Sequence, residues 1–254
     1  MQIQVVSLFP GLFTGSLAVG VCGRALARGL AEVSVVNPHD FATDTHRTLD
    51  DRPYGGGPGM VLKYEPLRDA ILAARRALPD GARVVFLSPQ GRKFDQAMAR
   101  EMRDWSGFVL VAGRYEGFDE RIVEAGADVE LSLGDFVLSG GEFAALAVID
   151  AVVRLLPGAL GDEASADQDS FSDGLLDCPQ YTRPEEIDGR AVPAVLLGGD
   201  HAAIRRWRLQ QSLGRTLTRR PDLLERRGLA AEERRLLGDY LAGQERPGKD
   251  LPGR

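Results

Sequence analysis

The sequence of 254 residues predicts an α/β fold with a mostly parallel sheet, followed by a small α-helical domain. Strand-like and helix-like runs alternate as far as residue 154, which favours a parallel sheet with helices on its faces. Three successive strands end in glycine-bearing loops. Beyond residue 200 the apolar residues follow helical spacing.

The expected elements follow one another in the order β-α-β-α-β-α. Strand-like runs of β-branched and apolar residues are Ile3–Phe9, Glu32–Val36, Arg83–Leu87, Gly107–Val111 and Val129–Leu133. A helix-length segment separates the first two strands, and a long connection rich in glycine and proline covers residues 37–63. The remaining segments with helical spacing are Pro66–Ala77, Phe94–Met102, Phe118–Ala125 and Glu142–Arg154.

The last three strands end in the loops Ser88–Gly91, Gly113–Gly117 and Gly134–Gly141. Ligands of open α/β sheets bind beyond the carboxyl ends of the strands, so these loops could converge on one ligand. Exposed backbone groups beside apolar walls suit a flat ligand with polar edges, such as a nucleoside. The alternative is that the glycines only satisfy turn geometry. Dinucleotide and Walker-type phosphate motifs do not occur in the sequence.

The composition is that of a soluble, cytoplasmic protein. Hydrophobic residues make up 44% of the chain, enough for a buried core, yet no run approaches the roughly 20 apolar residues of a membrane span. The N-terminus lacks the basic start and apolar stretch of a signal peptide. Cys22 and Cys178 are isolated, with neither metal spacing nor a disulfide framework.

Charge and composition divide the chain into two domains. Residues 119–190 carry 4 basic and 17 acidic side chains, whereas residues 191–254 carry 13 basic and 8 acidic ones. Residues 157–174 are acidic, small and unpatterned, which is typical of a linker. We therefore expect a domain at 1–160, a flexible linker at 161–174 and a helical domain at 175–254. Its helical patterns lie at about 201–217 and 231–241, with Pro221 opening a short helix between them.

An arginine-rich segment of the second domain is suited to phosphate. Residues 204–220 contain six arginines and no acid. Arginine pairs with phosphate bidentately, and arginines three residues apart can share a helix face. The alternative is that these arginines are only solvated, while Trp207, Leu209 and Leu213 form a core stripe. We expect Trp207 in the core and the arginines at an RNA backbone. The arginines expected to contact RNA include Arg205, Arg208, Arg215 and Arg219.

Six motifs in order resemble one known family. They are Asp50–Met60, Leu87–Lys93, Gly113–Gly117, Gly134–Glu142, Leu175–Pro179 and Ile204–Arg208. Each is of weak or moderate specificity alone, but their order and spacing extend the match from the first strand to about residue 241. The chain resembles the bacterial tRNA (guanine-N1)-methyltransferases, the TrmD family of the knotted SPOUT class.

The resemblance implies features that periodicity cannot show. It implies a trefoil knot in the sheet domain, S-adenosylmethionine as methyl donor, and a homodimer with active sites shared between chains. The acceptor is the guanosine at tRNA position 37, next to the anticodon. In the family the three glycine-bearing loops hold the donor, largely through backbone groups. Carried over to this sequence, the donor residues are Ser88, Pro89, Gly113, Glu116, Gly117, Ser132, Leu133, Gly134, Asp135, Phe136, Val137, Leu138, Gly140 and Gly141.

One donor residue departs from the family pattern. Phe136 stands where the family usually has tyrosine. Because much of the contact there is made by the main chain, donor binding is expected to survive, without any role of the tyrosine hydroxyl.

Methylation at N1 of guanine requires removal of the N1 proton. Asp169 matches the family's proposed general base, with Asp167 as a neighbouring competitor. A carboxylate is a weak base for this proton, so its surroundings must raise its basicity or stabilise the developing anion. Arg154 matches the residue thought to help, because a guanidinium near O6 stabilises the developing charge. Without the resemblance, Asp169 is a solvated linker acid and Arg154 complements a helix dipole.

The resemblance also implies tRNA contacts outside the arginine-rich segment and a linker that closes over the substrate. Arg52 and Ser165 are expected at the tRNA, and the acidic linker is expected to fold over the substrate when tRNA arrives. Magnesium has been linked to the family, but the sequence identifies no ligands for it, and His39 and His46 lack a recognised metal spacing. The alternatives are a SPOUT enzyme that methylates another nucleotide or a ribose, and a non-catalytic dimeric RNA-binding module.

Overall fold

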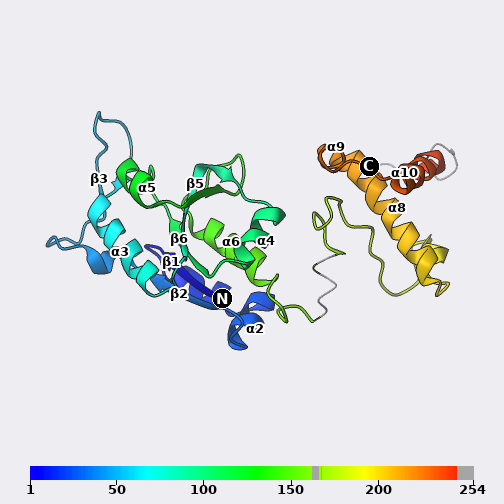
Figure 1. Ribbon diagram of the computed structural model, residues 1–254, viewed down its shortest axis with the longest axis horizontal. Coiled ribbons are helices and arrows are strands. Elements are labelled where there is room, and N and C mark those ends of the chain that lie inside the picture. The colour runs from blue at the N-terminus through cyan, green and yellow to red at the C-terminus, as the bar shows by residue number, and fades with distance from the viewer. Residues whose placement is uncertain (162–165, 167, 245–254) are drawn as a thin grey trace. The chain divides into compact units, whose positions relative to one another are not determined.

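The computed structural model describes residues 1–161, 166 and 168–244. The chain divides into two compact units, Met1–Glu163 and Ala164–Arg254. Figure 1 shows a sheet flanked by helices in the first unit and long helices in the second. In the part of the chain that the structure describes, no helix is long and apolar enough to cross a membrane.

The first unit is built on a five-stranded sheet in the order β2-β1-β6-β5-β7, with all neighbours parallel. Its strands are β1 (Gln2–Val6), β2 (Glu32–Val36), β5 (Arg83–Lys93), β6 (Gly107–Ala112) and β7 (Val129–Ser132). Every residue of the central strand β6 is buried. A strand covered on both faces needs a continuous apolar run, which Gly-Phe-Val-Leu-Val-Ala supplies.

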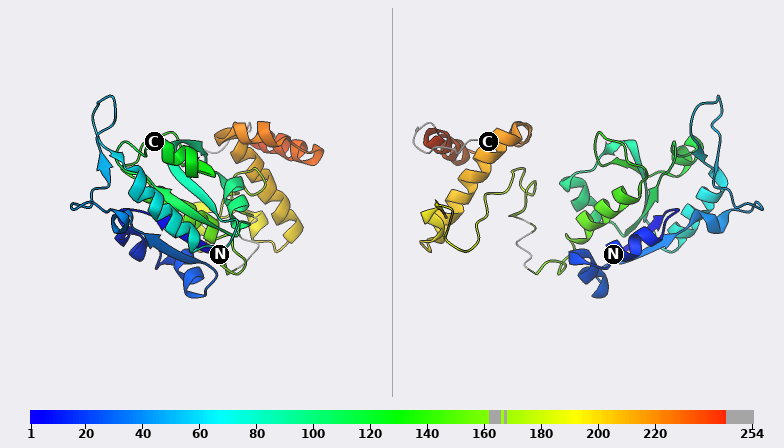
Figure 2. Two further views of the ribbon diagram at one scale, coloured as in Figure 1. Left: turned by 60° about the vertical axis from the view of Figure 1, so that its left-hand side comes forward. Right: turned by 180° about the vertical axis from the view of Figure 1, so that it is seen from behind.

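Helices cover both faces of this sheet. They are α1 (Gly11–Ser16), α2 (Gly20–Ala27), α3 (Tyr64–Arg76), α4 (Gln96–Arg103), α5 (Glu120–Gly126) and α6 (Glu142–Val153), with a 3-10 turn, η1, at Pro38–Phe41. Helix α3 packs against β1, β6 and α5, whereas α6 packs against β6 and the helices α1, α2 and α4. Figure 2 shows α3, in cyan, against the sheet. Alternate residues face α3, among them Phe86 and Val109.

Several boundaries differ from the sequence prediction. Strand β5 does not end at Leu87 but continues to Lys93, because Leu131 of β7 pairs first with Leu87 and then with Arg92. Residues 88–91 therefore form a bulge within β5. The stretch between the first two strands forms two helices, α1 and α2. The long connection also contains an antiparallel pair of strands, β3 (Asp50–Asp51) and β4 (Val61–Leu62). The sequence did not predict this pair, because each strand has only two residues.

The second unit has a small core of its own. Its helices are α8 (His201–Arg219), α9 (Pro221–Arg227) and α10 (Ala231–Gln244), and before them come the strand pair β8 (Glu186–Ile187) and β9 (Arg190–Ala191) and the turn η2 (Ala194–Leu196). The buried cluster joins Leu175 to Leu213, and Leu209 packs against it. Trp207 is only half-buried and lies against the ring of Tyr181, with centroids 6.4 Å apart. Its predicted place in the core stripe is therefore wrong.

Both cysteines are free and buried. Burial is the main cause that raises the pKa of Cys22 and of Cys178 above the ordinary value. A thiol with a raised pKa stays protonated at neutral pH, so both side chains act as small packing groups rather than nucleophiles.

Candidate functional site

The carboxyl ends of β6 and β7 and the bulge within β5 surround one cavity of about 320 Å³. Because neighbouring strands are parallel, the segments that leave their carboxyl ends lie at one edge of the sheet. The β5 bulge contributes Ser88 and Pro89, and the segment after β6 contributes Gly113–Phe118. The segment after β7 closes the cavity with Leu133, Gly134 and the run Phe136–Gly141. The volume suits a small-molecule ligand.

All of the residues predicted to hold the methyl donor line this cavity, except Asp135. The carboxylate of Asp135 is 97% exposed and lies 3.6 Å from the ammonium of Lys93, an exposed pair that stabilises little. The lining also contains residues that the sequence did not single out: Leu87, Gln90, Arg114, Tyr115, Phe118, Glu120, Val123, Glu130, Leu131, Ser139 and Ala144. Several of them lie between predicted residues in the same loops. Their position in these loops could have indicated from the sequence that they line the cavity.

The third loop reaches the second through backbone contact. The Gly141 N–H donates to the Gly113 carbonyl at 2.8 Å, and Gly140 forms an isolated antiparallel bridge with Arg114. A Cβ atom on Gly141 would lie 2.8 Å from the Ala112 Cα and 2.9 Å from the Gly113 nitrogen. Both atoms belong to the backbone at the end of the central strand and cannot yield locally. Glycine is therefore required at position 141 for this approach.

The Ser132 hydroxyl fixes the turn where β7 ends. It donates to the Gly134 carbonyl at 3.1 Å and accepts the Gly134 N–H at 3.2 Å, and both bonds are buried. The Phe136 N–H then donates to the same Gly134 carbonyl at 2.9 Å. The predicted donor loop thus begins from a hydrogen-bonded turn rather than a free chain.

A buried charge pair supports the cavity from behind. Glu142, at the start of α6, is fully buried and accepts a hydrogen bond from the Ser7 hydroxyl at 3.0 Å. Its Oε2 lies 2.9 Å from Nε of Arg114, although this approach is not aligned as a hydrogen bond. Arg114 also donates to the Ser139 carbonyl at 3.1 Å and stacks over the Phe9 ring at 4.4 Å. The pair thus ties β1, α6 and two cavity loops together.

The glycine-rich segment 52–60 connects β3 to β4 and is anchored beside the cavity. The Glu116 N–H donates to the Met60 carbonyl at 2.9 Å, and the Leu62 N–H donates to the Gly117 carbonyl at 3.0 Å. Figure 1 shows this connection projecting from the sheet unit beside α5. Arg52 is exposed on it, as an RNA contact would require.

The two predicted catalytic residues are not among the described lining of this cavity. Arg154 follows α6 as its C-cap residue, about 18 Å from the Glu142 end at 1.5 Å per residue. Asp169 is half-buried and belongs to the second unit. Ser165 and Asp167 lie outside the described residues.

Helix α8 displays the arginines that the sequence assigned to RNA. Arg205, Arg208 and Arg219 are exposed and Arg215 is half-buried. Their separations of three, seven and four residues place them along one side of the helix. Arg206 points elsewhere, with its guanidinium 4.0 Å from the Asp239 carboxylate.

A metal centre has no support among the described residues, where no three histidine, cysteine, aspartate or glutamate side chains gather. His39 lies in the turn η1, where its N–H donates to the Asn37 side chain at 3.0 Å.

Fold and cavity together define an α/β protein with a cavity of small-molecule size at one edge of a parallel sheet, joined to a helical unit in which Arg205, Arg208, Arg215 and Arg219 lie along one side of α8. A family profile described as tRNA (Guanine-1)-methyltransferase TrmD matches residues 1–226. The chain belongs to this family.

Similar proteins cover nearly the whole chain. A tRNA (guanine-N(1)-)-methyltransferase of Shewanella amazonensis is 58% identical over 249 residues, which span 98% of this chain and 100% of that protein. The enzyme of the same name from Chromohalobacter salexigens is 60% identical over 250 residues, 96% of this chain and 94% of its own. That of Pseudomonas syringae pv. tomato is 57% identical over 241 residues, 95% and 96% of the two chains.

Removing the buried carboxylate should weaken the first unit. Glu142→Ala leaves the largely buried Arg114 without its charge partner, so unfolding free energy is expected to fall by about 3–5 kcal/mol. Ser7→Ala, which removes a single hydrogen bond to the same carboxylate, is the matched control and should cost about 1 kcal/mol. Urea unfolding measures both. Equal losses for the two variants would contradict a structural role for the charge pair.

Proposed function

We propose that this protein transfers a methyl group from S-adenosylmethionine to N1 of the guanosine at position 37 of tRNA, next to the anticodon. The observation that carries the proposal is the cavity formed by the β5 bulge and the loops after β6 and β7 in a chain of this family. In this proposal the cavity binds the methyl donor. The arginine face of α8, formed by Arg205, Arg208, Arg215 and Arg219, binds the RNA backbone.

The cavity fits the donor by size and by character. Its volume of about 320 Å³ lies at the lower end of the usual range for small-molecule pockets. Its walls combine carbonyl and N–H groups of glycine-containing loops with apolar side chains such as Phe136 and Leu138, which suits a purine with polar edges. Glu116 and Glu130 are among the lining residues, and their negative charge complements a cationic ligand. The donor supplies an electrophilic methyl group when bound.

The acceptor must be deprotonated and its charge must be stabilised. The Asp169 carboxylate would accept the proton from N1, which frees the N1 lone pair for attack on the methyl carbon. The Arg154 guanidinium would donate hydrogen bonds to O6, where negative charge accumulates as the proton leaves. Water exclusion by the segment that carries Asp169 would strengthen both interactions.

We infer a homodimer with shared active sites from the position of Arg154. In one chain Arg154 and the cavity lie at opposite ends of α6, so an Arg154 that acts at a cavity would act at that of another chain. Exposed apolar side chains support such an interface: of the cavity residues Val137 is 86% exposed and Phe136 54%, and Phe143 at the start of α6 is 53% exposed. Apolar side chains gathered on a surface favour a partner.

The trefoil knot belongs to the same proposal. The segment 134–141 crosses the end of β6, where the Gly141 N–H meets the Gly113 carbonyl. In a trefoil knot the chain passes through a loop that it has itself formed. The crossing of segment 134–141 over the end of β6 is consistent with such a passage and supports the knot. The tRNA contacts proposed are those of Arg52, Arg205, Arg208, Arg215 and Arg219. A magnesium requirement stays a prediction of the resemblance, with no ligand set among the described residues.

The activity is tested by incubation with labelled S-adenosylmethionine and unmodified tRNA that has guanosines at positions 36 and 37. Nucleoside analysis by mass spectrometry should detect 1-methylguanosine, and a tRNA with another base at position 37 should yield none. A methylated ribose or a methyl group on another nucleotide would contradict the proposed target. Tight tRNA binding without any methylated product would indicate a binding-only protein.

Asp169→Asn should reduce the single-turnover rate by about 10²- to 10⁴-fold, because the amide cannot accept the N1 proton. Affinities for S-adenosylmethionine and tRNA should stay near the wild-type values, as measured by calorimetry and filter binding. A rate within a few-fold of wild type would remove Asp169 from the mechanism.

Charge reversal on the arginine face of α8 should lower the affinity for tRNA. It should also make that affinity less sensitive to salt concentration. Arg205→Glu lies in the first turns of α8, where an acidic residue is compatible with the helix dipole, so folding is preserved. The slope of log affinity against log salt concentration should become less negative by about 1. Arg76→Glu, an exposed change of equal charge in the last turn of α3, is the control, and circular dichroism checks its folding because an acid there opposes the helix dipole. Equal effects of the two variants would exclude specific contact by the α8 face.

A further inference from the structure

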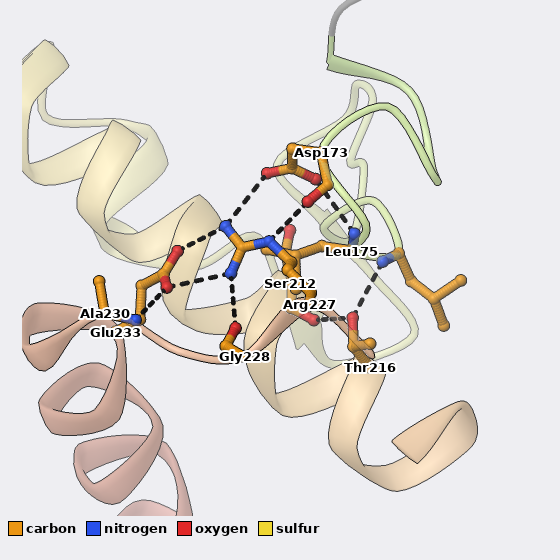
Figure 3. Close-up of polar contacts among 9 residues, drawn as sticks. Asp173, Leu175, Ser212, Thr216, Arg227, Gly228, Ala230 and Glu233 are labelled. Carbon is orange, nitrogen blue, oxygen red and sulfur yellow. Dashed lines mark hydrogen bonds and ion pairs between the residues drawn. The ribbon is translucent and has the colours of Figure 1, made fainter. Parts of the chain in front are cut away.

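Residues 168–176, the segment that carries Asp169, are folded onto the helices of the second unit. Figure 3 shows Arg227, at the end of α9, between this segment and the start of α10. Its Nε donates to the Asp173 carbonyl at 2.5 Å, and its Nη2 lies 4.0 Å from the Asp173 carboxylate. On its other side, Nη1 and Nη2 donate to the two oxygens of Glu233 at 3.0 and 2.7 Å.

The pairing with Glu233 holds the Arg227 guanidinium in one orientation. Both oxygens of the carboxylate are engaged, which is the fork geometry that arginine favours. Glu233 also accepts the Ala230 N–H at 2.8 Å, so its carboxylate is tied to the start of α10. The hydrogen bonds from Arg227 hold the pKa of Glu233 below its ordinary value, and the carboxylate is charged at neutral pH. Side-chain exposures of 25% and 13% place both groups largely out of solvent.

The segment meets Arg227 through a glycine. Gly174 has a φ of +83°, and a Cβ atom there would lie 2.9 Å from Cδ of Arg227. A side chain at this position would be strained by the backbone and would press on the arginine stem. The close approach of the Asp173–Gly174 backbone to Arg227 therefore depends on glycine.

Two hydrogen-bonded turns lead from this contact back to Asp169. The Ser172 N–H donates to the Asp169 carbonyl at 3.1 Å, and the Phe171 N–H donates to the Leu175 carbonyl at 2.7 Å. Leu175 is buried in the helical core, and the Leu176 N–H donates to the Thr216 hydroxyl of α8 at 2.9 Å. The backbone at Asp169 is thus connected to the same helices that carry the arginine face.

We propose that Arg227 is a positioning residue for the methyl transfer: it clamps the Asp169 segment to the RNA-binding helices through the Asp173 carbonyl. The carboxylate then moves as one body with the bound tRNA and meets the guanine only when the RNA is in place. This inference rests on the proposed role of Asp169 as general base.

The test compares variants of the full-length protein in single-turnover methyl transfer at saturating tRNA and S-adenosylmethionine. Arg227→Ala should lower the rate by about 10- to 100-fold, as small misplacements of reacting groups do, while tRNA affinity stays within about twofold. Arg227→Lys, which keeps the charge but lacks the fork, should show a smaller loss. Arg226→Ala removes the neighbouring arginine, which is 74% exposed and paired with Asp222, and should leave the rate unchanged.

Gly174→Ala reaches the same contact from the opposite side and keeps the inference testable if Arg227→Ala does not fold. It should lower the rate without changing tRNA affinity. In the Asp169→Asn background, Arg227→Ala should cause no further loss, because a positioning residue acts only through the group that it positions. Losses that multiply in the double variant would overturn the inference, as would a loss that disappears at higher tRNA concentration.

The two proposals fail separately. An Asp169→Asn protein with a normal rate removes the base assignment, and the role of Arg227 falls with it. An inactive Asp169→Asn protein together with a fully active Arg227→Ala protein overturns only the clamp.

Discussion

The cavity depends on one backbone contact, that of Gly141 with Gly113. The central strand β6 ends at Ala112, and the loop after β7 can close over that end only if position 141 carries no Cβ atom. Through this approach Phe136–Gly141 and Gly113–Phe118 line the same cavity, together with the β5 bulge. A parallel sheet supplies the common edge, and the glycine supplies the closure.

A buried ion pair, Glu142 with Arg114, reinforces the contact between the cavity loops, although burying a charge costs free energy. Glu142 is fully buried, and Ser7 and Arg114 are the groups that compensate its desolvation. The helix N-terminus at which Glu142 lies adds a favourable dipole. Since Arg114 also holds the Ser139 carbonyl, the stability of α6 and the shape of the cavity are coupled through one guanidinium.

The cavity and the arginine-bearing helix lie in different units. The sheet unit contains the cavity, whereas the helical unit contains the arginine face and the Asp169 segment. The polar network around Arg227 keeps that segment with the helices (Figure 3). A base that accompanies the RNA rather than the donor would couple deprotonation to arrival of the correct substrate, which limits unproductive contact between donor and base.

Much of the fold was predictable because it follows from local pattern. The alternation of strands and helices, the glycine-bearing strand ends and the arginine-rich helix are properties of neighbouring residues, and β2 has the bounds that its run of residues predicts. Predictions were wrong where the pattern was short or where pairing overrode it. The two-residue strands β3 and β4 leave too little sequence to detect, and β5 outlasts its apolar run because β7 continues to pair with it.

The sequence by itself determined which glycine-bearing segments would line the cavity, since glycine and strand periodicity act over a few residues. Only the tertiary structure decided which partners these loops would find. Ser7 and Glu142 are 135 positions apart, and Asp173 and Arg227 are 54 apart. The Ser7–Glu142 contact depends on how the elements of the first unit pack around its sheet, and the Asp173–Arg227 contact on how α9 packs against residues 173–175 of the second unit.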